Sequence, residues 1–451
     1  MRSILQFLRQ ARQLHLQFLA GTLQQPPIYV LGNPSADLDS IISAILYSYC
    51  ANNRLPTTTP RPHIPLLNLP TLHAGPELYR LRPEFVTALW LSTNSPALPD
   101  EGFQNSSESA GNLLREHIIT TADFAQNLKD QSRQKLNVDV TLVDWNALPE
   151  RIGKNKGSLP GILSNITFHV VGCIDHHVDE DFISSTSQIQ PLIIQPGPGS
   201  CASLITNEMH ERGFWGVDCS AEIAQLAKLA LAPILIDTSN LTAEGKVTDV
   251  DVRAVDLLRS RAGGDQWMEG FYEEILSAKQ NSLDRLTLHE VLDRDYKEWA
   301  EVAQSSGRSI TLGFCSSVKP IRWIIEKAGS PQEFLDGMRS FGTSKEVDVV
   351  VVMTSFTSSK GDFSRELFIS VIGDHGVAVE GIEAFVAHAA SHLGLTEWTA
   401  LDGETVDVSD EEIRSTLDRD KGPWSALWVQ KETKASRKQL APLLREAVSK
   451  I

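Results

Sequence analysis

The sequence predicts an α/β protein of two domains, in which an N-terminal, mostly parallel sheet flanked by helices precedes a smaller C-terminal α/β or α+β domain. Short apolar runs alternate with helical stretches through the N-terminal part, which is the pattern of right-handed βαβ units and a parallel sheet. The run Ala262-Gly-Gly-Asp265 then has the composition of a linker. We therefore expect domains at 1–264 and 265–451, with an active site in the cleft between them.

Composition and charge exclude several classes of protein. The chain has 451 residues and a formal net charge of −16, which argues against general nucleic-acid binding. It has no apolar run of about 18 residues or more, so we expect no membrane span. The five cysteines are scattered without a CxxC pair, which argues against a disulfide scaffold or zinc ribbon and favours a reducing compartment.

The N-terminal stretch is poor in acids and carries Arg2, Arg9 and Arg12 among apolar residues, with Asp37 as the first acid. A mitochondrial transit peptide has such a composition. The alternative is a first helix that packs on the domain. We favour the helix because the strand Ile28–Leu31 follows after a short gap, and we therefore expect a cytoplasmic protein, with a mitochondrial location as the lesser alternative.

The remaining N-terminal elements follow from apolar runs and caps. We expect strands at Ile28–Leu31, Val138–Val143, Ile166–Ile174 and within 191–199, with weaker ones at Leu66–Leu69 and Ala88–Leu91, and a loop at 92–112. We expect helices at Ser40–Tyr49, at Ser200–Arg212 with Ser200 as N-cap, and at Ala221–Leu231, which leads into a further strand-like run, Pro233–Asp237.

The C-terminal part is less regularly interleaved. After a helix around 249–261 we expect helices near 268–282, 288–304, 378–393 and 436–449, and strands near 309–315, 347–353 and 366–372. No GxxxxGK[ST] or credible GxGxxG run is present, so nothing indicates a nucleotide P-loop or a dinucleotide site.

Acids and histidines follow the predicted strands of the N-terminal domain. They are Asp37, Asp39, Asp144, the run Asp175-His176-His177, and Asp237. Because the carboxyl ends of parallel strands share one edge of the sheet, we expect these side chains to converge. Carboxylates with one or two imidazoles suit Mg²⁺, Mn²⁺ or Co²⁺ better than structural zinc. Two such ions about 4 Å apart clamp a phosphoryl group, so the pattern predicts metal-dependent hydrolysis of phosphate esters or anhydrides.

The same motifs resemble those of the DHH phosphoesterase superfamily. They are Asn33-Pro-Ser-Ala-Asp37-Leu-Asp39-Ser40, Leu142-Val-Asp144-Trp-Asn146, Asp175-His176-His177 and Ile236-Asp237-Thr238. Ala435-Ser-Arg437-Lys438-Gln-Leu-Ala-Pro442 and Asp295-Tyr296-Lys297 resemble the second domain of its pyrophosphatase and exopolyphosphatase branch. Within that branch, the segment from Gly32 to Ser40 and the helix after it are most similar to the fungal cytosolic exopolyphosphatases.

The resemblance implies a role for each matching residue. Asp37 and Asp39 would bind one metal ion each, Asp144 and Asp237 would bridge the two ions, and His176 would ligate the second ion. His177 would face the phosphate or the attacking water, with Asp175 orienting it. Substrate phosphates would be bound by Lys297, Arg437 and Lys438 and near Ser200. Arg322, Arg365, Lys421 and Lys434 are further candidates, but we interpret them as surface charge.

Two departures from the family pattern bear on the substrate. Manganese pyrophosphatases of the superfamily have His at the position of Asn33, whereas the exopolyphosphatases resemble this chain there. Asn33 would be a poorer metal ligand through its amide oxygen and more tolerant of Mg²⁺. Trp145 stands where many relatives have a polar residue. The resemblance therefore does not predict which groups surround the carboxylate of Asp144.

The resemblance therefore implies an exopolyphosphatase with two divalent cations, Mg²⁺ or Mn²⁺ with Co²⁺ as the alternative. It would act as a monomer on inorganic polyphosphate, with no nucleic acid and no membrane as partner. An inorganic pyrophosphatase or a phosphodiesterase of short nucleotides is the alternative among enzymes. A regulatory binding protein without turnover is the alternative from another class.

Overall fold

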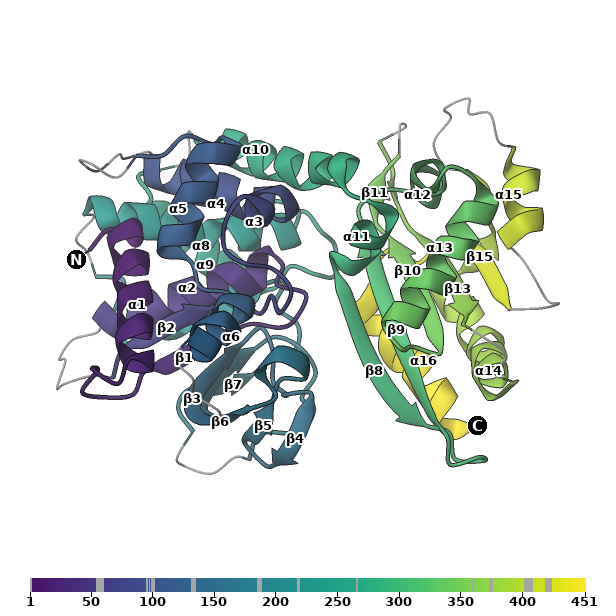
Figure 1. Cartoon of the computed structure of the whole chain (residues 1–451). Coiled ribbons are helices and arrows are strands. Elements are labelled where there is room, and N and C mark those ends of the chain that lie inside the picture. Colours follow the sequence, from purple (N-terminus) through teal and green to yellow (C-terminus); the bar gives the residue numbers. More distant parts are fainter. Residues whose placement is uncertain are drawn as a thin grey trace. The chain divides into compact units, whose positions relative to one another are not determined.

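The computed structural model (Figure 1) divides into two compact units, Met1–Ser282 (unit 1) and Leu283–Ile451 (unit 2). It describes the chain except residues 1, 54–60, 95, 97, 99–101, 131–134, 185–188, 217–219, 265–266, 359–360, 373–375, 401–408 and 418–423, and except the side chains of Ile162 and Arg285. Lys421 and Cys219 thus lie outside the described residues. Cys50, Cys173, Cys201 and Cys315 are buried free thiols.

Unit 1 is built on the mostly parallel sheet that the sequence predicts. Its strands are β1 (Ile28–Leu31), β2 (His63–Leu66), β3 (Leu136–Val143), β4 (Glu150–Gly153), β5 (Lys156–Ser158), β6 (Ile166–Asp175) and β7 (Leu192–Ile194). The order is β2-β1-β3-β6-β5-β4, with β7 also on β6. The pairs β1–β2, β1–β3, β3–β6 and β6–β7 are parallel, and only β4–β5 and β5–β6 are antiparallel.

Helices cover both faces of this sheet. They are α1 (Ile4–Leu19), α2 (Leu38–Asn53), α3 (Pro76–Leu81), α4 (Pro83–Asn94), α5 (Ser107–His117), α6 (Thr121–Asp130), α7 (Cys201–Glu211), α8 (Ala221–Asp237), α9 (Asp249–Arg261) and α10 (Met268–Asn281). Neighbouring strand residues face opposite cores, since Val30 lies in the cluster with α2, α7 and α8, and Tyr29 in the cluster with α6. The first helix, α1, packs into unit 1 through buried Ile4, Leu5 and Leu8.

Three expectations for unit 1 were wrong. Residues Ala88–Leu91 belong to α4, and Ser107–His117 of the expected loop form α5. The run Pro233–Asp237 is not a strand but the last part of α8, which continues through Pro233. Asp237 therefore comes from the end of a helix. Ser200 caps α7 as expected, because its hydroxyl accepts from Ala202 N.

Unit 2 has its own six-stranded sheet in the order β14-β15-β13-β10-β9-β8. The strands are β8 (Tyr296–Val302), β9 (Ser309–Ser317), β10 (Val349–Thr354), β13 (Glu366–Val371), β14 (Leu395–Glu397) and β15 (Ser425–Gln430), beside a small hairpin of β11 (Phe356–Thr357) and β12 (Phe363–Ser364). Only β9–β10 is a parallel pair. One face packs on α11 (Leu288–Asp293), α12 (Ile321–Ala328), α13 (Pro331–Ser344) and α15 (Asp410–Leu417), and the other on α14 (Gly376–Leu393) and α16 (Arg437–Lys450).

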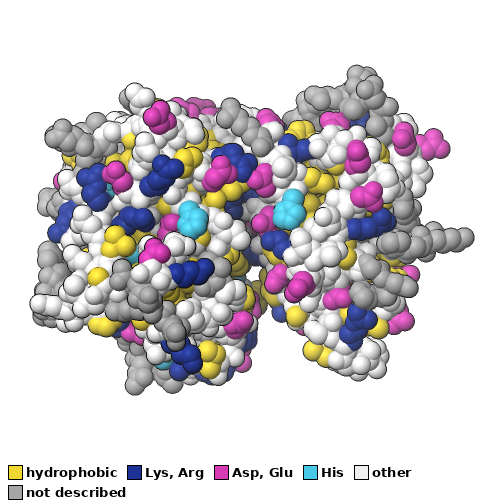
Figure 2. Space-filling view, in the orientation of Figure 1, with side chains coloured by type: hydrophobic (Ala, Val, Ile, Leu, Met, Phe, Trp, Pro, Cys, Tyr) yellow, Lys and Arg dark blue, Asp and Glu magenta, His cyan; other side chains and the backbone are white. Residues whose placement is uncertain are grey.

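Unit 2 differs from expectation in two places. The helix expected near 288–304 is the short α11 followed by β8. The division between the units falls after Ser282 rather than after Gly264, because α10 packs on α4 and α8 of unit 1. On the face drawn in Figure 2, acidic and basic side chains are interspersed over each unit. No helix in the described part of the chain is long and apolar enough to cross a membrane.

Candidate metal centre

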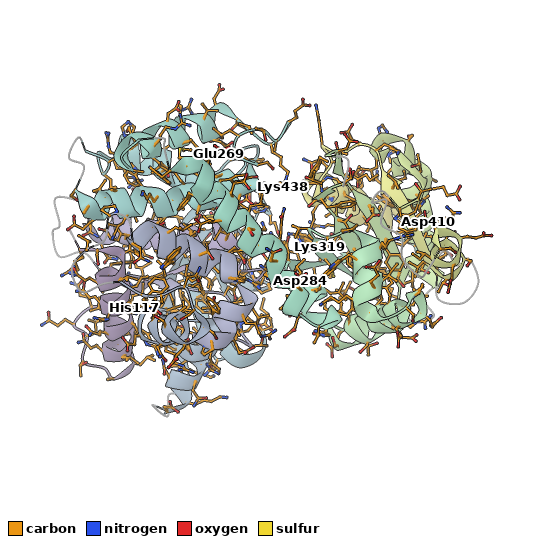
Figure 3. All side chains as sticks on the ribbon, turned by 90° about the horizontal axis from the view of Figure 1, so that it is seen from above. His117, Glu269, Asp284, Lys319, Asp410 and Lys438 are labelled. Carbon is orange, nitrogen blue, oxygen red and sulfur yellow. The ribbon has the colours of Figure 1, made fainter. Side chains whose placement is uncertain are left out.

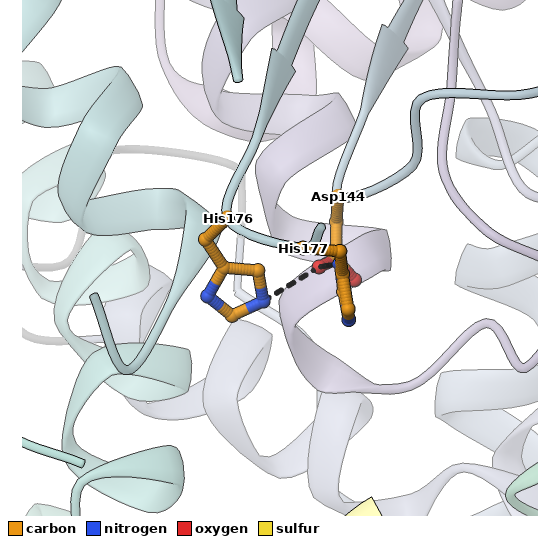
Figure 4. Close-up of side chains that lie close together, drawn as sticks. All are labelled: Asp144, His176 and His177. Carbon is orange, nitrogen blue, oxygen red and sulfur yellow. Dashed lines mark ion pairs between the residues drawn. The ribbon is translucent and has the colours of Figure 1, made fainter. Parts of the chain in front are cut away.

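Among the described residues, Asp144, His176 and His177 form a group of side chains that could hold a metal ion (Figure 4). They follow β3 and β6, which are parallel neighbours with Val143 opposite Ile174. One potential ligand atom from each lies within 4.8 Å of the others. Asp144 has a left-handed backbone (φ 54°), and its N–H donates to the carbonyl of Ile174 at 3.0 Å. This turn at the strand end directs the carboxylate to the two imidazoles.

His176 has one ring nitrogen directed at a backbone carbonyl and the other at a carboxylate. Its Nδ1 lies 2.9 Å from the oxygen of Pro198, which can only accept, so we assign the proton to Nδ1. In the neutral ring, the Nε2 lone pair then faces Asp144 Oδ1 at 3.0 Å. Two acceptors at this distance need a cation or a proton between them. About 3 Å is also the separation of two adjacent ligands that each lie about 2.1 Å from a divalent ion. The donor set therefore fits a metal.

Asp39 lies buried at the N-terminus of α7. Its Oδ1 accepts from Ser200 Oγ at 2.8 Å and from Ala202 N at 3.1 Å, and its Oδ2 accepts from Cys201 N at 2.6 Å. Oδ2 also lies 3.8 Å from His176 Nε2. Burial raises the pKa of Asp39 well above its usual value, and the nearby carboxylates of Asp144, Asp237 and Asp37 raise it further against the opposing effect of His176. A cation would relieve this crowding of negative charge.

Asn33 and Ser40 orient the carboxylate of Asp144. Asn33 Nδ2 donates to Asp144 Oδ2 at 2.7 Å, and Ser40 Oγ donates to the same oxygen at 2.6 Å. This arrangement directs Oδ1 to the histidines. The amide oxygen of Asn33 accepts from Ser35 N at 3.0 Å. Asn33 therefore holds Asp144 through its nitrogen, and its ligand role through oxygen stays a prediction.

Asp175, the last residue of β6, holds His177. The carboxylate oxygen Oδ1 lies 2.7 Å from His177 Nδ1, and Oδ2 accepts from Asn146 Nδ2 at 2.6 Å. Burial alone would raise the pKa of Asp175, but the imidazoles of His177 and His176 and the amide of Asn146 outweigh it and hold the pKa below its usual range. Sequence reasoning assigned no role to Asn146, although it stands two residues after Asp144.

Asp37 and Asp237 belong to the same electrostatic group. Burial raises the pKa of Asp237 to about 7; Asp37 and Asp144 add to the rise, while Lys279 and Lys246 oppose it. Asp237 ends α8, where the helix dipole also disfavours a carboxylate. Asp37 accepts from Ser40 N at 3.0 Å. The structure thus brings the expected acids of unit 1 into interaction, although Asp237 arrives from a helix.

Asp251, which the sequence did not single out, anchors the loop that carries this centre. It is fully buried near the start of α9, and its carboxylate accepts from Gly199 N at 2.9 and 3.1 Å, from Ser203 Oγ at 2.7 Å and from Thr248 N at 2.9 Å. Gly199 lies between Pro198, the partner of His176, and Ser200, the partner of Asp39. A Cβ at Gly199 would come within 2.6 Å of Thr238 Cγ2, so the loop also requires glycine there.

The basic residues expected to bind substrate lie at two neighbouring places in unit 2. Lys297 is on β8, and Arg437 and Lys438 open α16 (Lys438 is labelled in Figure 3). Arg437 donates to the carbonyl of Asp295 at 2.8 Å and to its Oδ1 at 2.7 Å. The Arg437 and Lys297 segments are thereby joined. Ser200, by contrast, lies in unit 1, where its hydroxyl donates to Asp39, so a contact with substrate stays a prediction.

A parallel α/β unit with a carboxylate and imidazole centre thus precedes a separate unit with a mixed sheet. Residues 273–447 match the family model described as the DHHA2 domain. A putative exopolyphosphatase from Schizosaccharomyces pombe is 28% identical over 440 residues, covering 96% of this chain and 94% of the relative.

A solved structure adds to these matches. The crystal structure of a putative family II inorganic pyrophosphatase from Methanococcus jannaschii is similar with a TM-score of 0.50 at 18% identity, covering 93% of this chain and 98% of that one. This likeness concerns the fold. Residues 273–447 thus match the DHHA2 domain, and these likenesses agree with the resemblance of the motifs to the DHH superfamily.

Proposed function

We propose that this protein is a metal-dependent exopolyphosphatase, which releases the terminal phosphate of inorganic polyphosphate. The observation that carries the proposal is the group of Asp144, His176 and His177, in which an imidazole lone pair faces a carboxylate oxygen at 3.0 Å. The fungal relative named a putative exopolyphosphatase aligns over nearly the whole of both chains and supports the choice of substrate. The coarser class, a phosphatase of polyphosphate or pyrophosphate, agrees with both comparisons.

The residues that would hold divalent ions are Asp37, Asp39, Asp144, His176 and Asp237. Two Mg²⁺ or Mn²⁺ ions at such a centre would supply Lewis acidity, which activates water and offsets phosphate charge. The protein's own contribution is to keep the donors oriented before an ion binds. Asp39 is fixed by the first turn of α7, Asp144 by Asn33 and Ser40, and His176 by the carbonyl of Pro198.

His177 is the proposed proton-transfer residue. Its Nδ1–H donates to Asp175 Oδ1, which leaves Nε2 of the neutral ring to accept a proton from water and, once protonated, to donate to a phosphate oxygen. Asp175 fixes the tautomer and the ring orientation and favours the protonated ring. The side chain of His177 is 28% exposed, whereas that of Asp175 is fully buried, so the imidazole is the member of the pair that a substrate reaches.

Phosphates beyond the terminal one are proposed to bind the cations of unit 2. Arg437 and Lys438 begin α16, whose first-turn N–H groups also favour anions. Lys297 lies two residues after Asp295, the ion-pair partner of Arg437.

The test is phosphate release from long-chain polyphosphate and from pyrophosphate at equal Mg²⁺ or Mn²⁺. We expect the polyphosphate to be cleaved faster, with phosphate as the product throughout. Asp144→Asn and His177→Gln should each lower the rate by about 100-fold or more. His73→Gln, at a side chain that is 62% exposed, is the matched control and should have no effect.

The same assay separates the alternatives. Faster turnover of pyrophosphate would make the protein a pyrophosphatase. Metal-dependent cleavage of short nucleotides alone would make it a phosphodiesterase. Binding of polyphosphate with no hydrolysis at any metal concentration would make it a regulatory binding protein and would refute the proposal.

A further inference from the structure

Arg365 is a buried cation for which the described part of the chain supplies no carboxylate. The residue joins β12 to β13 and is only 5% exposed. Its Nε donates to the carbonyl of Thr433 at 2.7 Å, but it takes part in none of the ion pairs among the described residues. Other arginines of unit 2 are paired: Arg322 with Asp410, Arg437 with Asp295 and Arg445 with Glu301. The sequence-based interpretation of Arg365 as surface charge was therefore wrong.

Such an arrangement is costly in free energy. A guanidinium loses hydration on burial, and a paired carboxylate normally offsets that loss. Burial lowers the pKa of Arg365 to about 10, so the side chain remains cationic at neutral pH. A buried guanidinium that has no carboxylate partner among the described residues is a feature expected of an anion-binding site.

The position of Arg365 points to the N-terminus of α16. Gln430 N donates to the carbonyl of Arg365 at 2.9 Å, and Gln430 Nε2 donates to the carbonyls of Glu432 and Ala435 at 2.7 and 2.6 Å. Thr433, which accepts from the guanidinium, lies in the same turn. This turn, residues 431–435, leads directly into the cap Ser436 and the first residues of α16. Arg365 therefore lies against the segment that opens the helix.

Phe363 covers one side of the guanidinium. Its ring centroid lies 5.1 Å from Arg365 Cζ, and Phe363 itself is 48% exposed. Stacking on an aromatic ring holds the guanidinium plane while its remaining N–H donors keep their fork geometry. This is the geometry in which arginine binds phosphate through two parallel hydrogen bonds.

We propose that Arg365 and the N-terminal turn of α16 form a phosphate-binding site, which takes a phosphate group of an inorganic polyphosphate chain. The proposal deepens the proposed function and depends on it for the identity of the ligand. The site would add a buried guanidinium to the cations at the start of α16. A chain of several phosphates would thus bind unit 2 more tightly than inorganic phosphate.

A purely structural role is the alternative, because the hydrogen bond to Thr433 also ties down the turn. The variants Arg365→Met and Arg365→Lys distinguish the two roles. Methionine keeps an apolar stem of similar length and removes the charge, whereas lysine keeps the charge but not the fork. If the role is structural, the two variants change thermal stability and leave anion affinity unchanged.

The experiment is calorimetric titration of the full-length protein with tripolyphosphate in EDTA, which removes divalent ions from unit 1. We expect Arg365→Met to weaken binding by about 10-fold to 100-fold, the usual worth of a charge-assisted hydrogen bond, and Arg365→Lys to weaken it less. Arg308→Met is the control. Arg308 pairs with Asp348 and lies near Ser305, which contacts Ile451 at the other end of α16, so its loss should not change affinity.

Equal affinities of Arg365→Met and the native protein would overturn the site, as would an absence of tripolyphosphate binding by the native protein. Phosphate release with added metal tests the proposed function separately. If the protein binds tripolyphosphate through Arg365 but releases no phosphate, the binding site is supported and the proposed activity is refuted. If Arg365→Met hydrolyses polyphosphate with the same KM as the native protein, the proposed activity is supported and the binding site is refuted.

Discussion

Single histidines in unit 1 serve opposite purposes. As a proposed metal ligand, His176 would have to stay unprotonated at Nε2, whereas His15 of α1 fills the core. His15 is fully buried, with Nδ1 2.8 Å from the hydroxyl of Tyr29 and Nε2 3.2 Å from Asn127 Nδ2. Burial lowers its pKa from 6.5 to about 3, with Arg12 adding to the decrease and Asp123 opposing it. His15 therefore remains neutral in the folded protein at pH values well above 3.

This burial predicts a loss of stability in mild acid. Above pH 6.5 His15 is neutral in both states and has no effect. Below that pH the unfolded chain binds a proton that the folded chain cannot, so the free energy of unfolding falls until pH 3 is approached. At pH 5 the loss is about 2 kcal/mol. We expect His15→Gln to show that much less destabilisation between pH 7.5 and pH 5 in thermal or urea unfolding.

The comparison with His15→Gln isolates one group, because the other buried histidines titrate alike in both proteins. Burial also lowers the pKa of His63, to about 4. An identical loss of stability on acidification in the native protein and the variant would show that His15 is protonated in the folded state.

The sequence predicted which residues follow the strands, but it did not predict the hydrogen-bond partners of these residues. Asp144 and His176 follow apolar runs, and parallel strands that are neighbours must end at one edge. The orientation of Asn33 depends on Ser35 and Asp144, which are set by the loop conformation. No spacing in the sequence specifies that orientation.

At the scale of elements, the loop between β7 and α7 connects the centre to α9 through Asp251. We predict that Asp251→Asn weakens metal binding by the folded protein by about 10-fold to 100-fold, the usual effect of losing a partner behind the ligands. An asparagine amide would place N–H donors against Gly199 N or Thr248 N, and the loop that orients His176 and Asp39 would shift. Calorimetric titration with Mn²⁺, well below the unfolding temperature, is the measurement.

Asp249→Asn is the control for this prediction, since Asp249 is exposed in the same first turn of α9. If Asp251 merely stabilised the fold, Asp251→Asn would lower the melting temperature and leave the Mn²⁺ affinity of the folded protein unchanged. That result would refute the proposed role of Asp251 in orienting the metal ligands.

The elements that the sequence mispredicted share a physical cause. From Leu226 to Ile236 every residue of α8 is buried, so its apolar residues show no helical period, and the run after Pro233 resembles a strand. Lys297, Glu298 and Glu301 favour a helix by propensity, yet they belong to β8 at the edge of its sheet, where charged side chains reach water. Packing overrides local preference in both cases.

At the scale of the whole molecule, the two units have separate hydrophobic cores. Two core clusters lie within unit 1 and two within unit 2, one on each face of each sheet. Two domains were expected from the sequence, and the structure divides into two units. The boundary was misplaced because the linker signal at Gly263 and Gly264 comes before α10, and only the packing of that helix assigns it to unit 1.

The separate cores predict that metal stabilises one unit alone, because all the proposed ligands lie in unit 1. An ion at 100 times its dissociation constant adds about 2.7 kcal/mol to the stability of the unit that binds it. We expect scanning calorimetry with Mn²⁺ to raise one transition by about 5 °C or more and to leave the other in place. Asp144→Asn should abolish the shift and thereby identify the transition of unit 1. A single transition that rises as a whole would show that the two units unfold together. No rise in any transition would refute the metal centre.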